Sequence, residues 1–145
     1  MGKITIKPLY FGQDESYLSQ LFELFEQQWG EVDKAQNSVV AQKIPPPIAI
    51  LDNQKVVGGV SFIEYPHPNG ADSAIWINAL LVLPQHRNHG LAKQLLEYAV
   101  TLASSYGEQR LYVYTDVPNF YRKQNWQAHH QNSDGKHWVL EYNFD

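Results

Sequence analysis

Residues 80–92 are the part of the sequence whose residue types and spacing best suit chemistry. Residues 80–83 form an apolar run typical of a buried strand, and Pro84 ends it. A short polar loop then leads straight into a long helical pattern. The first amides of a helix have no acceptor within it, and the helix dipole adds partial positive charge there. The segment therefore predicts a site for a phosphate or pyrophosphate group.

Three residues of this loop support that interpretation. Gly90 lets a ligand approach the backbone closely, and Ala92 is too small to block the way. Arg87 can add a charge-assisted hydrogen bond to an anion. Taken alone, a strand, a loop and a helix with one glycine indicate phosphate binding only weakly.

The loop needs a scaffold, and hydrophobic periodicity predicts one of mixed α/β class. Helices are expected at residues 14–29, 33–42, 91–106 and 118–123. Strands are expected at residues 4–9, 48–51, 55–63, 74–83 and 111–115, with one or two more in the tail, where residues 136–144 alternate. The strands at 48–51 and 55–63 are joined by a turn at Asp52-Asn53, which predicts a hairpin.

The pattern Arg87-x-x-Gly90-x-Ala92, preceded by Pro84 and an apolar strand, resembles the coenzyme A signature of the GNAT superfamily of N-acetyltransferases. A second segment, residues 119–126, is similar to the Phe-Tyr-x-x-x-Gly-Phe segment of the same family. Asn125 stands where the family usually has glycine, and asparagine tolerates the left-handed backbone of such a turn. Asp116 stands near where many members have an asparagine that bonds the cofactor arm.

The resemblance covers essentially the whole chain, so it implies a single GNAT-like domain over residues 1–145. The implied fold is an α/β mixed sheet whose central parallel strands, 74–83 and 110–115, splay apart to admit the pantetheine arm. The implied cofactor is acetyl-CoA. Its expected ligands lie along the loop, with one more before the Phe-Tyr pair: Leu81, Val82, Leu83, Arg87, Asn88, His89, Gly90, Leu91, Ala92 and Asn119.

Acetyl transfer to an amine needs an oxyanion donor, a general acid and a deprotonated amine. A backbone N–H near residues 80–82, on a strand whose neighbour splays away, suits the oxyanion. The resemblance makes Tyr121 the acid that protonates the departing thiolate, since a phenol of pKa near 10 is protonated at neutral pH. Glu64 is one candidate base, with Asp72 and Asp116 as further options. Each carboxylate could equally be solvated surface charge, and Tyr121 could simply pack.

The expected acceptor is the primary amine of a small molecule or of a peptide N-terminus. We expect it to approach from the side of Trp29 and Tyr65, with Asn78 orienting it or a water. An acidic excess in the neighbouring segments favours a cationic ligand through electrostatic steering. Its members are Glu26, Glu31, Asp33, Glu64 and Asp72.

Composition narrows the other function classes. The net charge is −4 without a block of Lys and Arg, so nucleic acid is not an expected partner. There is no cysteine, and His86 and His89 lack a third ligand, so no metal site is predicted. No apolar run could span a membrane, and the first residues do not resemble a signal peptide. We therefore expect a cytoplasmic protein, either a monomer or a homodimer.

Two other readings stay open. One is a coenzyme A-binding sensor that has the cofactor site but no turnover. The other is an unrelated α/β module that binds a different phosphate ligand, in which case the match at Phe120-Tyr121 is a coincidence. Release of free thiol in the presence of candidate amines separates the enzyme from both.

Overall fold

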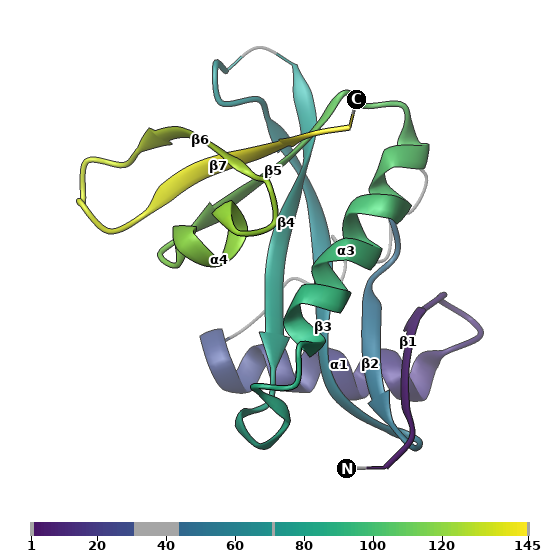
Figure 1. Ribbon diagram of the computed structural model, residues 1–145. Coiled ribbons are helices and arrows are strands. Elements are labelled where there is room, and N and C mark those ends of the chain that lie inside the picture. Colours follow the sequence, from purple (N-terminus) through teal and green to yellow (C-terminus); the bar gives the residue numbers. More distant parts are fainter. Residues whose placement is uncertain (1, 31–43, 71, 145) are drawn as a thin grey trace.

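The computed structural model describes residues 2–30, 44–70 and 72–144. Within these ranges a seven-stranded mixed sheet runs through the molecule in the order β1-β2-β3-β4-β5-β7-β6 (Figure 1). The β4–β5 pair is parallel and every other neighbouring pair is antiparallel. The strands are β1 (Ile4–Pro8), β2 (Ile48–Asp52), β3 (Lys55–Pro66), β4 (Ser73–Val82), β5 (Arg110–Thr115), β6 (Gln127–Gln131) and β7 (Trp138–Asn143).

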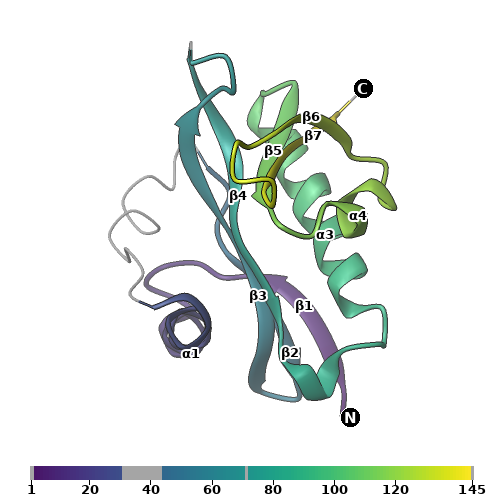
Figure 2. The ribbon, with the colours of Figure 1, turned by 90° about the vertical axis from the view of Figure 1, so that its left-hand side faces the viewer.

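Helices cover both faces of this sheet. Figure 2 shows α1 (Glu15–Trp29) on one face, with α3 (Leu91–Ala103) and α4 (Pro118–Arg122) on the other. Short 3₁₀ turns, η1 (Pro84–His86) and η2 (Ser104–Tyr106), lie before and after α3. No helix in the described ranges is long and apolar enough to cross a membrane.

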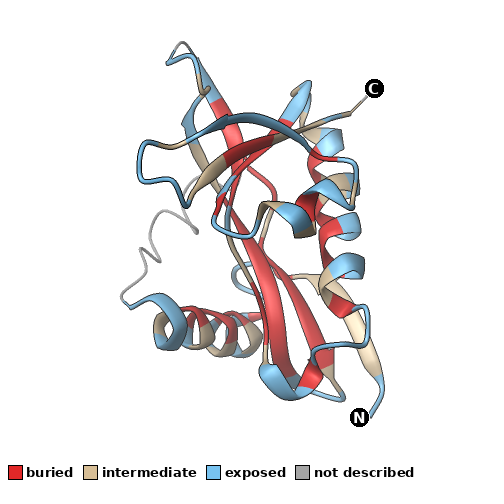
Figure 3. Ribbon diagram, turned by 60° about the vertical axis from the view of Figure 1, so that its left-hand side comes forward, coloured by how far each residue is buried: buried red, intermediate tan, exposed pale blue. Residues whose placement is uncertain are grey.

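The main core lies between α3 and the sheet. Successive strand residues point to opposite faces, so alternate apolar residues of β2 to β5 meet the apolar stripe of α3. Figure 3 shows the buried residues concentrated along the middle strands and on the side of α3 that faces them. Leu95, Leu96 and Ala99 of α3 are almost fully enclosed there, against Ile50, Phe62 and other strand residues.

A second core lies under α1. Leu18, Leu21, Phe22 and Phe25 recur at helical spacing and face Ala49, Leu51, Val56 and Leu81 of the sheet. The helix comes close because β3 has glycine at position 59. A Cβ there would lie 2.5 Å from Leu21 Cδ1 and 2.6 Å from the Ile48 carbonyl oxygen. Gly59 is therefore a packing requirement of the α1 face.

Most predicted elements are confirmed, with small differences at their ends. The hairpin of β2 and β3 turns at Asn53, whose φ of 57° suits asparagine. Strand β3 continues past Ile63 to Pro66, so the loop to β4 is shorter than expected. The tail forms two strands: β7 covers the alternating segment, and β6 comes before it. Every residue of β6 is exposed, so this strand has no apolar stripe. The helix expected at residues 33–42 lies outside the described residues.

The packing at position 59 gives a stability prediction. Gly59→Ala should destabilise the fold by about 1–3 kcal/mol, because the Ile48 carbonyl is backbone and cannot rotate away. Urea and thermal unfolding should both report the loss. Gln127→Ala on exposed β6 is the control, and it should change the stability by less than about 0.5 kcal/mol. Equal stability of the two variants would contradict this account of Gly59.

Candidate functional site

The two central parallel strands separate soon after they meet. Strands β4 and β5 pair only at Trp76–Tyr112 and Ile77–Val113. Beyond this point β4 continues to Val82, whereas β5 diverges and leads towards α4 (Figure 1). The expected splayed pair is therefore present, and over residues 78–82 one edge of β4 has no strand of the described ranges beside it.

A β-bulge marks the point of separation. Phe62 of β3 pairs with Ile77 and Ser61 pairs with Ala79, so Asn78 is an extra residue on β4. A bulge bends its strand and re-aims the neighbouring side chains. Asn78 is exposed, unlike the buried residues on either side of it at 74–77 and 81–82. The sheet thus opens at the residue that stood out in the sequence as polar within an apolar strand.

Backbone groups on the free edge of β4 need partners. The Leu83 N–H donates to the Val57 carbonyl, so Leu83 and, by alternation, Leu81 turn their backbone groups towards β3. Leu80 and Val82 then face the open edge. The Val82 carbonyl accepts a hydrogen bond of 2.8 Å from Arg87 Nε. The N–H groups of Leu80 and Val82 face this open edge, where no described strand pairs with them.

The loop after β4 is shaped to present amides. Asn88 and Gly90 both have positive φ, 67° and 74°, and Gly90 is the residue that caps α3. No side chain caps this helix, so the first amides, from Leu91 onwards, are free to bind an anion. A Cβ on Gly90 would meet nothing within 4 Å, which leaves open space in front of the backbone. Arg87 is held beside this loop by its bond to Val82.

The two loop histidines have different surroundings. His86 is buried, and its Nε2 donates a 2.8 Å hydrogen bond to Asp52 Oδ2 at the end of β2. That bond holds the pKa of Asp52 below its usual value. His86 therefore ties the loop to the β2–β3 hairpin and does not face a phosphate. His89 is exposed. No group of three metal-ligating side chains occurs among the described residues.

Tyr121 lies on α4 and is buried in the main core. Its ring packs edge-on against Phe120 and Trp126, with centroids 5.0 and 5.2 Å away. Asn125 has a φ of 73°, so the turn made by glycine in the related motif is preserved. Burial raises the pKa of the Tyr121 hydroxyl far above 10. The expectation of an ordinary phenol is therefore wrong: Tyr121 in the free protein holds its proton more tightly. Asn119, earlier on α4, is exposed and accepts a 3.3 Å hydrogen bond from Arg122.

A cavity of about 500 Å³ lies on the sheet beside the separation of β4 and β5. Its lining is mostly aromatic and apolar: Ile63, Tyr65, Pro66, His67, Pro68, Trp76, Ile77, Asn78, Tyr114, His130 and Val139. Ile63, Trp76 and Val139 belong to a small cluster separate from the α3 core, so this aromatic pocket opens on the face opposite α3. No Asp or Glu of the described chain lines it.

The floor of the aromatic pocket is held by close packing. Trp76 lies 5.1 Å from Tyr112 and 5.8 Å from Tyr65, measured between ring centroids. The Trp76 Nε1–H donates to the carbonyls of both Tyr65 and Pro66. Tyr112 is buried beneath, and its hydroxyl lies 3.2 Å from His67 Nδ1.

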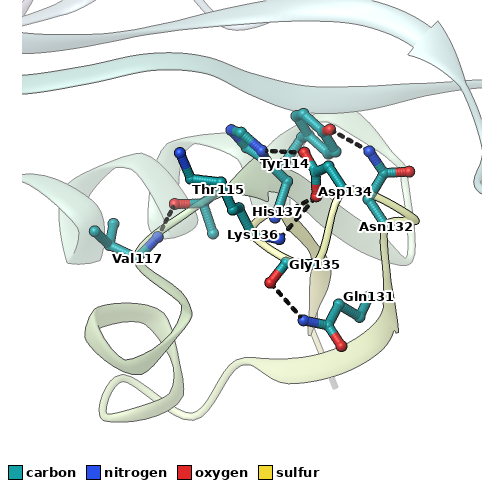
Figure 4. Close-up of polar contacts among 9 residues, drawn as sticks. All are labelled: Tyr114, Thr115, Val117, Gln131, Asn132, Asp134, Gly135, Lys136 and His137. Atoms are coloured by element: carbon teal, nitrogen blue, oxygen red, sulfur yellow. Dashed lines mark hydrogen bonds and ion pairs between the residues drawn. The ribbon is translucent and has the colours of Figure 1, made fainter.

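Polar contacts hold the loop between β6 and β7 together (Figure 4), and this loop contacts Tyr114, which lines the pocket. Tyr114 stacks on His137 at 4.7 Å, and its hydroxyl accepts a 2.7 Å hydrogen bond from Asn132. Asp134 accepts hydrogen bonds from the backbone amides of His137 and Lys136, and also from the His137 ring. These bonds lower the pKa of Asp134, and the two backbone hydrogen bonds have the largest effect. The loop is therefore built around a carboxylate that stays ionised and indirectly holds Tyr114.

The structure brings together only part of the predicted acceptor side. Tyr65 and Asn78 line the pocket. Trp29 does not: it ends α1, is half exposed and packs on Phe25. Glu64 pairs with Ile75, which faces α3, so its side chain lies on the face opposite the pocket. Its carboxylate therefore lies outside the aromatic pocket.

Other pocket residues were missed from the sequence. The sequence places His67 between two expected strands, and it places Tyr114, with Tyr112 of the pocket floor, in the strand expected at 111–115. Their spacing of two residues did carry a signal, because residues i and i+2 of a strand share a face. The position of His67 carried none, since it depends on how far β3 extends.

Solved structures share this fold along the whole described chain. yncA of Salmonella typhimurium, solved with its cofactor acetyl-CoA, is 16% identical with a TM-score of 0.74, over 99% of this chain and 95% of that one. Arabidopsis thaliana Naa50, solved with the bisubstrate analogue CoA-Ac-MVNAL, is 16% identical with a TM-score of 0.68, over 97% and 99%. The N-acetylglutamate synthase of Neisseria gonorrhoeae, complexed with coenzyme A and N-acetyl-glutamate, is 14% identical with a TM-score of 0.67. The chain is covered completely in that match but spans only 36% of the synthase.

At such identities these likenesses show the fold alone, and a search of curated proteins finds no match. A family model gives the further step. The model for the acetyltransferase (GNAT) family matches residues 12–143, which include the open edge of β4, the α3 loop and α4. This chain therefore belongs to the GNAT acetyltransferase family.

Proposed function

We propose that this protein transfers an acetyl group from acetyl-CoA to a primary amine, with the chain acting as one domain. The observation that carries the proposal is the end of β4–β5 pairing at Ile77–Val113, immediately before the uncapped start of α3. A free strand edge can bond an amide-containing arm of a ligand, and the free helix terminus that follows it along the chain can bond a pyrophosphate. Coenzyme A has both.

The chain's own groups fit such a cofactor. The amides of Leu91 and Ala92, together with Gly90, would hold the pyrophosphate, with Asn88 and His89 beside them and Arg87 adding charge. The edge groups of Leu80 and Val82 would bond the pantetheine arm, flanked by Leu81 and Leu83, with Asn119 near its far end. When bound, acetyl-CoA supplies the activated acetyl thioester. That yncA and the Brucella melitensis GNAT protein were solved with acetyl-CoA supports the choice.

The catalytic step needs an amine to attack the thioester carbonyl while the developing oxyanion is stabilised. The Leu80 N–H, next to the bulge, is the best placed donor, because a fixed amide costs no reorganisation during reaction. The thiolate that leaves must gain a proton, and Tyr121 is the proposed donor. Its raised pKa keeps it protonated in the free protein but disfavours release of the proton, so the role requires a thiolate held directly beside the hydroxyl.

The aromatic pocket is the proposed site of the acceptor amine. It adjoins the bulge through Asn78, so an amine held there can meet an acetyl group lying along β4. Its walls are rings and apolar side chains without a described carboxylate, which favours an amine next to a flat or apolar group. This replaces steering by acidic residues as the basis of acceptor choice. The Arabidopsis thaliana structure with CoA-Ac-MVNAL, whose peptide part begins with an apolar residue, is consistent with this class.

Cofactor binding is tested by thermal stability. Acetyl-CoA at one hundred times its Kd should stabilise the fold by about 2.7 kcal/mol, a melting shift of several degrees. Gly90→Val should abolish the shift, because its side chain enters the open space before the α3 amides. Gly107→Val is the matched control: it too has positive φ and open space at the Cβ, but it lies beyond the far end of α3. No shift in the wild-type protein at millimolar acetyl-CoA would refute the proposal.

The role of Tyr121 is tested by Tyr121→Phe, which removes the hydroxyl and keeps the packing. Turnover should fall about 10²–10⁴-fold, while the affinity for acetyl-CoA should stay nearly unchanged. Tyr142→Phe, in the same aromatic cluster, should keep full turnover. Normal turnover of Tyr121→Phe would reduce Tyr121 to a core residue. Acetyl-CoA binding without thiol release by the wild type, for any amine, would favour the sensor reading.

The acceptor class is tested by a panel of amines read out by thiol release. 2-Phenylethylamine and peptides with a large apolar N-terminal residue should have higher kcat/KM than spermidine. Tyr65→Ala should raise the KM for the preferred amine about tenfold or more, and leave the KM for acetyl-CoA unchanged. Glu64→Gln is the control on the opposite face, and it should change neither KM. A preference for spermidine that depended on Glu64 would contradict the aromatic-pocket assignment.

A further inference from the structure

We propose that His67 is the group that takes the proton from the acceptor amine, and that Tyr112 is the residue that positions it. This rests on the proposed acetyl transfer. His67 lines the aromatic pocket together with Asn78, at the bulge where the acetyl group would lie. It is the half-buried histidine of that pocket, whereas His130, which also lines it, is exposed.

The backbone of His67 is fixed from both sides. Its N–H donates a 2.7 Å hydrogen bond to the Asp72 carbonyl, and its own carbonyl accepts one of 2.7 Å from Gly70. The two carbonyls before it, those of Tyr65 and Pro66, accept from Trp76 Nε1. The turn that carries His67 is therefore anchored to a buried side chain of the central strand, which keeps the imidazole in one place.

The imidazole itself is oriented by Tyr112. His67 Nδ1 lies 3.2 Å from the Tyr112 hydroxyl, and the two rings meet edge to face at 5.5 Å and 88°. Tyr112 does not line the pocket, so it contacts the His67 ring on the side away from the pocket. If Nδ1 carries the hydrogen and donates to the Tyr112 oxygen, Nε2 has a lone pair available to the pocket.

Other groups around the pocket do not suit this task. The titratable side chains that face His67 are Tyr112 from β5 below, and Tyr65, Tyr114 and His130 across the pocket. A phenol hydroxyl is a much weaker base than an imidazole nitrogen. The nearest ring nitrogen of His130 lies 2.7 Å from His129 on the exposed strand β6, so that ring has no buried partner to orient it. Asp72 contributes only its backbone carbonyl.

The proposed step balances without any added reagent. The neutral amine nitrogen forms a bond to the thioester carbonyl carbon, and the C–S bond then breaks. The proton on the amine nitrogen passes to His67 Nε2, giving an imidazolium whose Nδ1–H still donates to Tyr112. A proton from Tyr121 passes to the thiolate. The products are the N-acetylated amine and coenzyme A, and solvent restores both side chains.

The test is the pH profile of kcat/KM for 2-phenylethylamine at saturating acetyl-CoA. His67→Asn keeps a donor near the Nδ1 position but has no base, so kcat/KM at pH 7.5 should fall about 10²–10⁴-fold. The acidic limb that reports loss of the neutral imidazole should disappear from its profile. Tyr112→Phe should lower kcat/KM less than His67→Asn does. It should also shift the acidic limb along the pH axis, because the His67 imidazole remains but loses its hydrogen-bond partner. His129→Gln, on exposed β6 and outside the lining of the pocket, is the control, and it should behave as wild type.

A second measurement does not need turnover. Long-range ¹H–¹⁵N spectra of the wild-type protein at pH 8 should show His67 protonated on Nδ1, and Tyr112→Phe should shift it towards the mixture found in free histidine. An Nε2-protonated His67 would overturn the proposal, as would His67→Asn with wild-type rate and pH profile. Failure of the wild-type protein to bind acetyl-CoA would instead refute the proposed function, so the two failures are distinguishable.

Discussion

The structure depends on one interruption: parallel pairing between β4 and β5 stops after Trp76–Tyr112 and Ile77–Val113. Strand β5 is paired along its full length with β7, so it follows the β6–β7 hairpin away from β4. Strand β4 is held on its other side by nine register partners in β3 and cannot follow. The unpaired backbone groups that result are costly unless a ligand bonds them. The active-site proposal follows from this constraint.

The interruption also explains why two different surfaces meet at one residue. On the α3 side, the edge of β4 runs into a loop with two left-handed residues and an uncapped helix, which suits an anionic cofactor. On the other face, aromatic residues of β3, β4 and β5 form a cavity without a described carboxylate. The bulge at Asn78 lies where these surfaces join. Holding two reactants side by side at such an opening can by itself remove a large part of the activation barrier.

Several side chains with reactive chemistry serve structure instead. His86 lies in the middle of the cofactor motif, yet it bonds Asp52 and fixes the loop to the β2–β3 hairpin. Asp134 and His137 hold the β6–β7 loop, which in turn holds Tyr114. Tyr121 is buried in the core, and the burial that packs it also raises its pKa. In each case the partner, rather than the residue type, decides what the side chain can do.

The sequence by itself determined the order of elements and the loop between β4 and α3, because both depend on local patterns: hydrophobic periodicity, Pro84, and the spacing of Arg87, Gly90 and Ala92. It also singled out Tyr65 and Asn78, which the fold brings together in the aromatic pocket. Only the tertiary structure decided which way Glu64 and Trp29 point and which residues accompany Tyr65. The face of a strand residue depends on register and on the bulge, and a one-residue change in register reverses it. The contact of His67 with Tyr112, 45 residues apart, exists only because β3, β4 and β5 lie side by side.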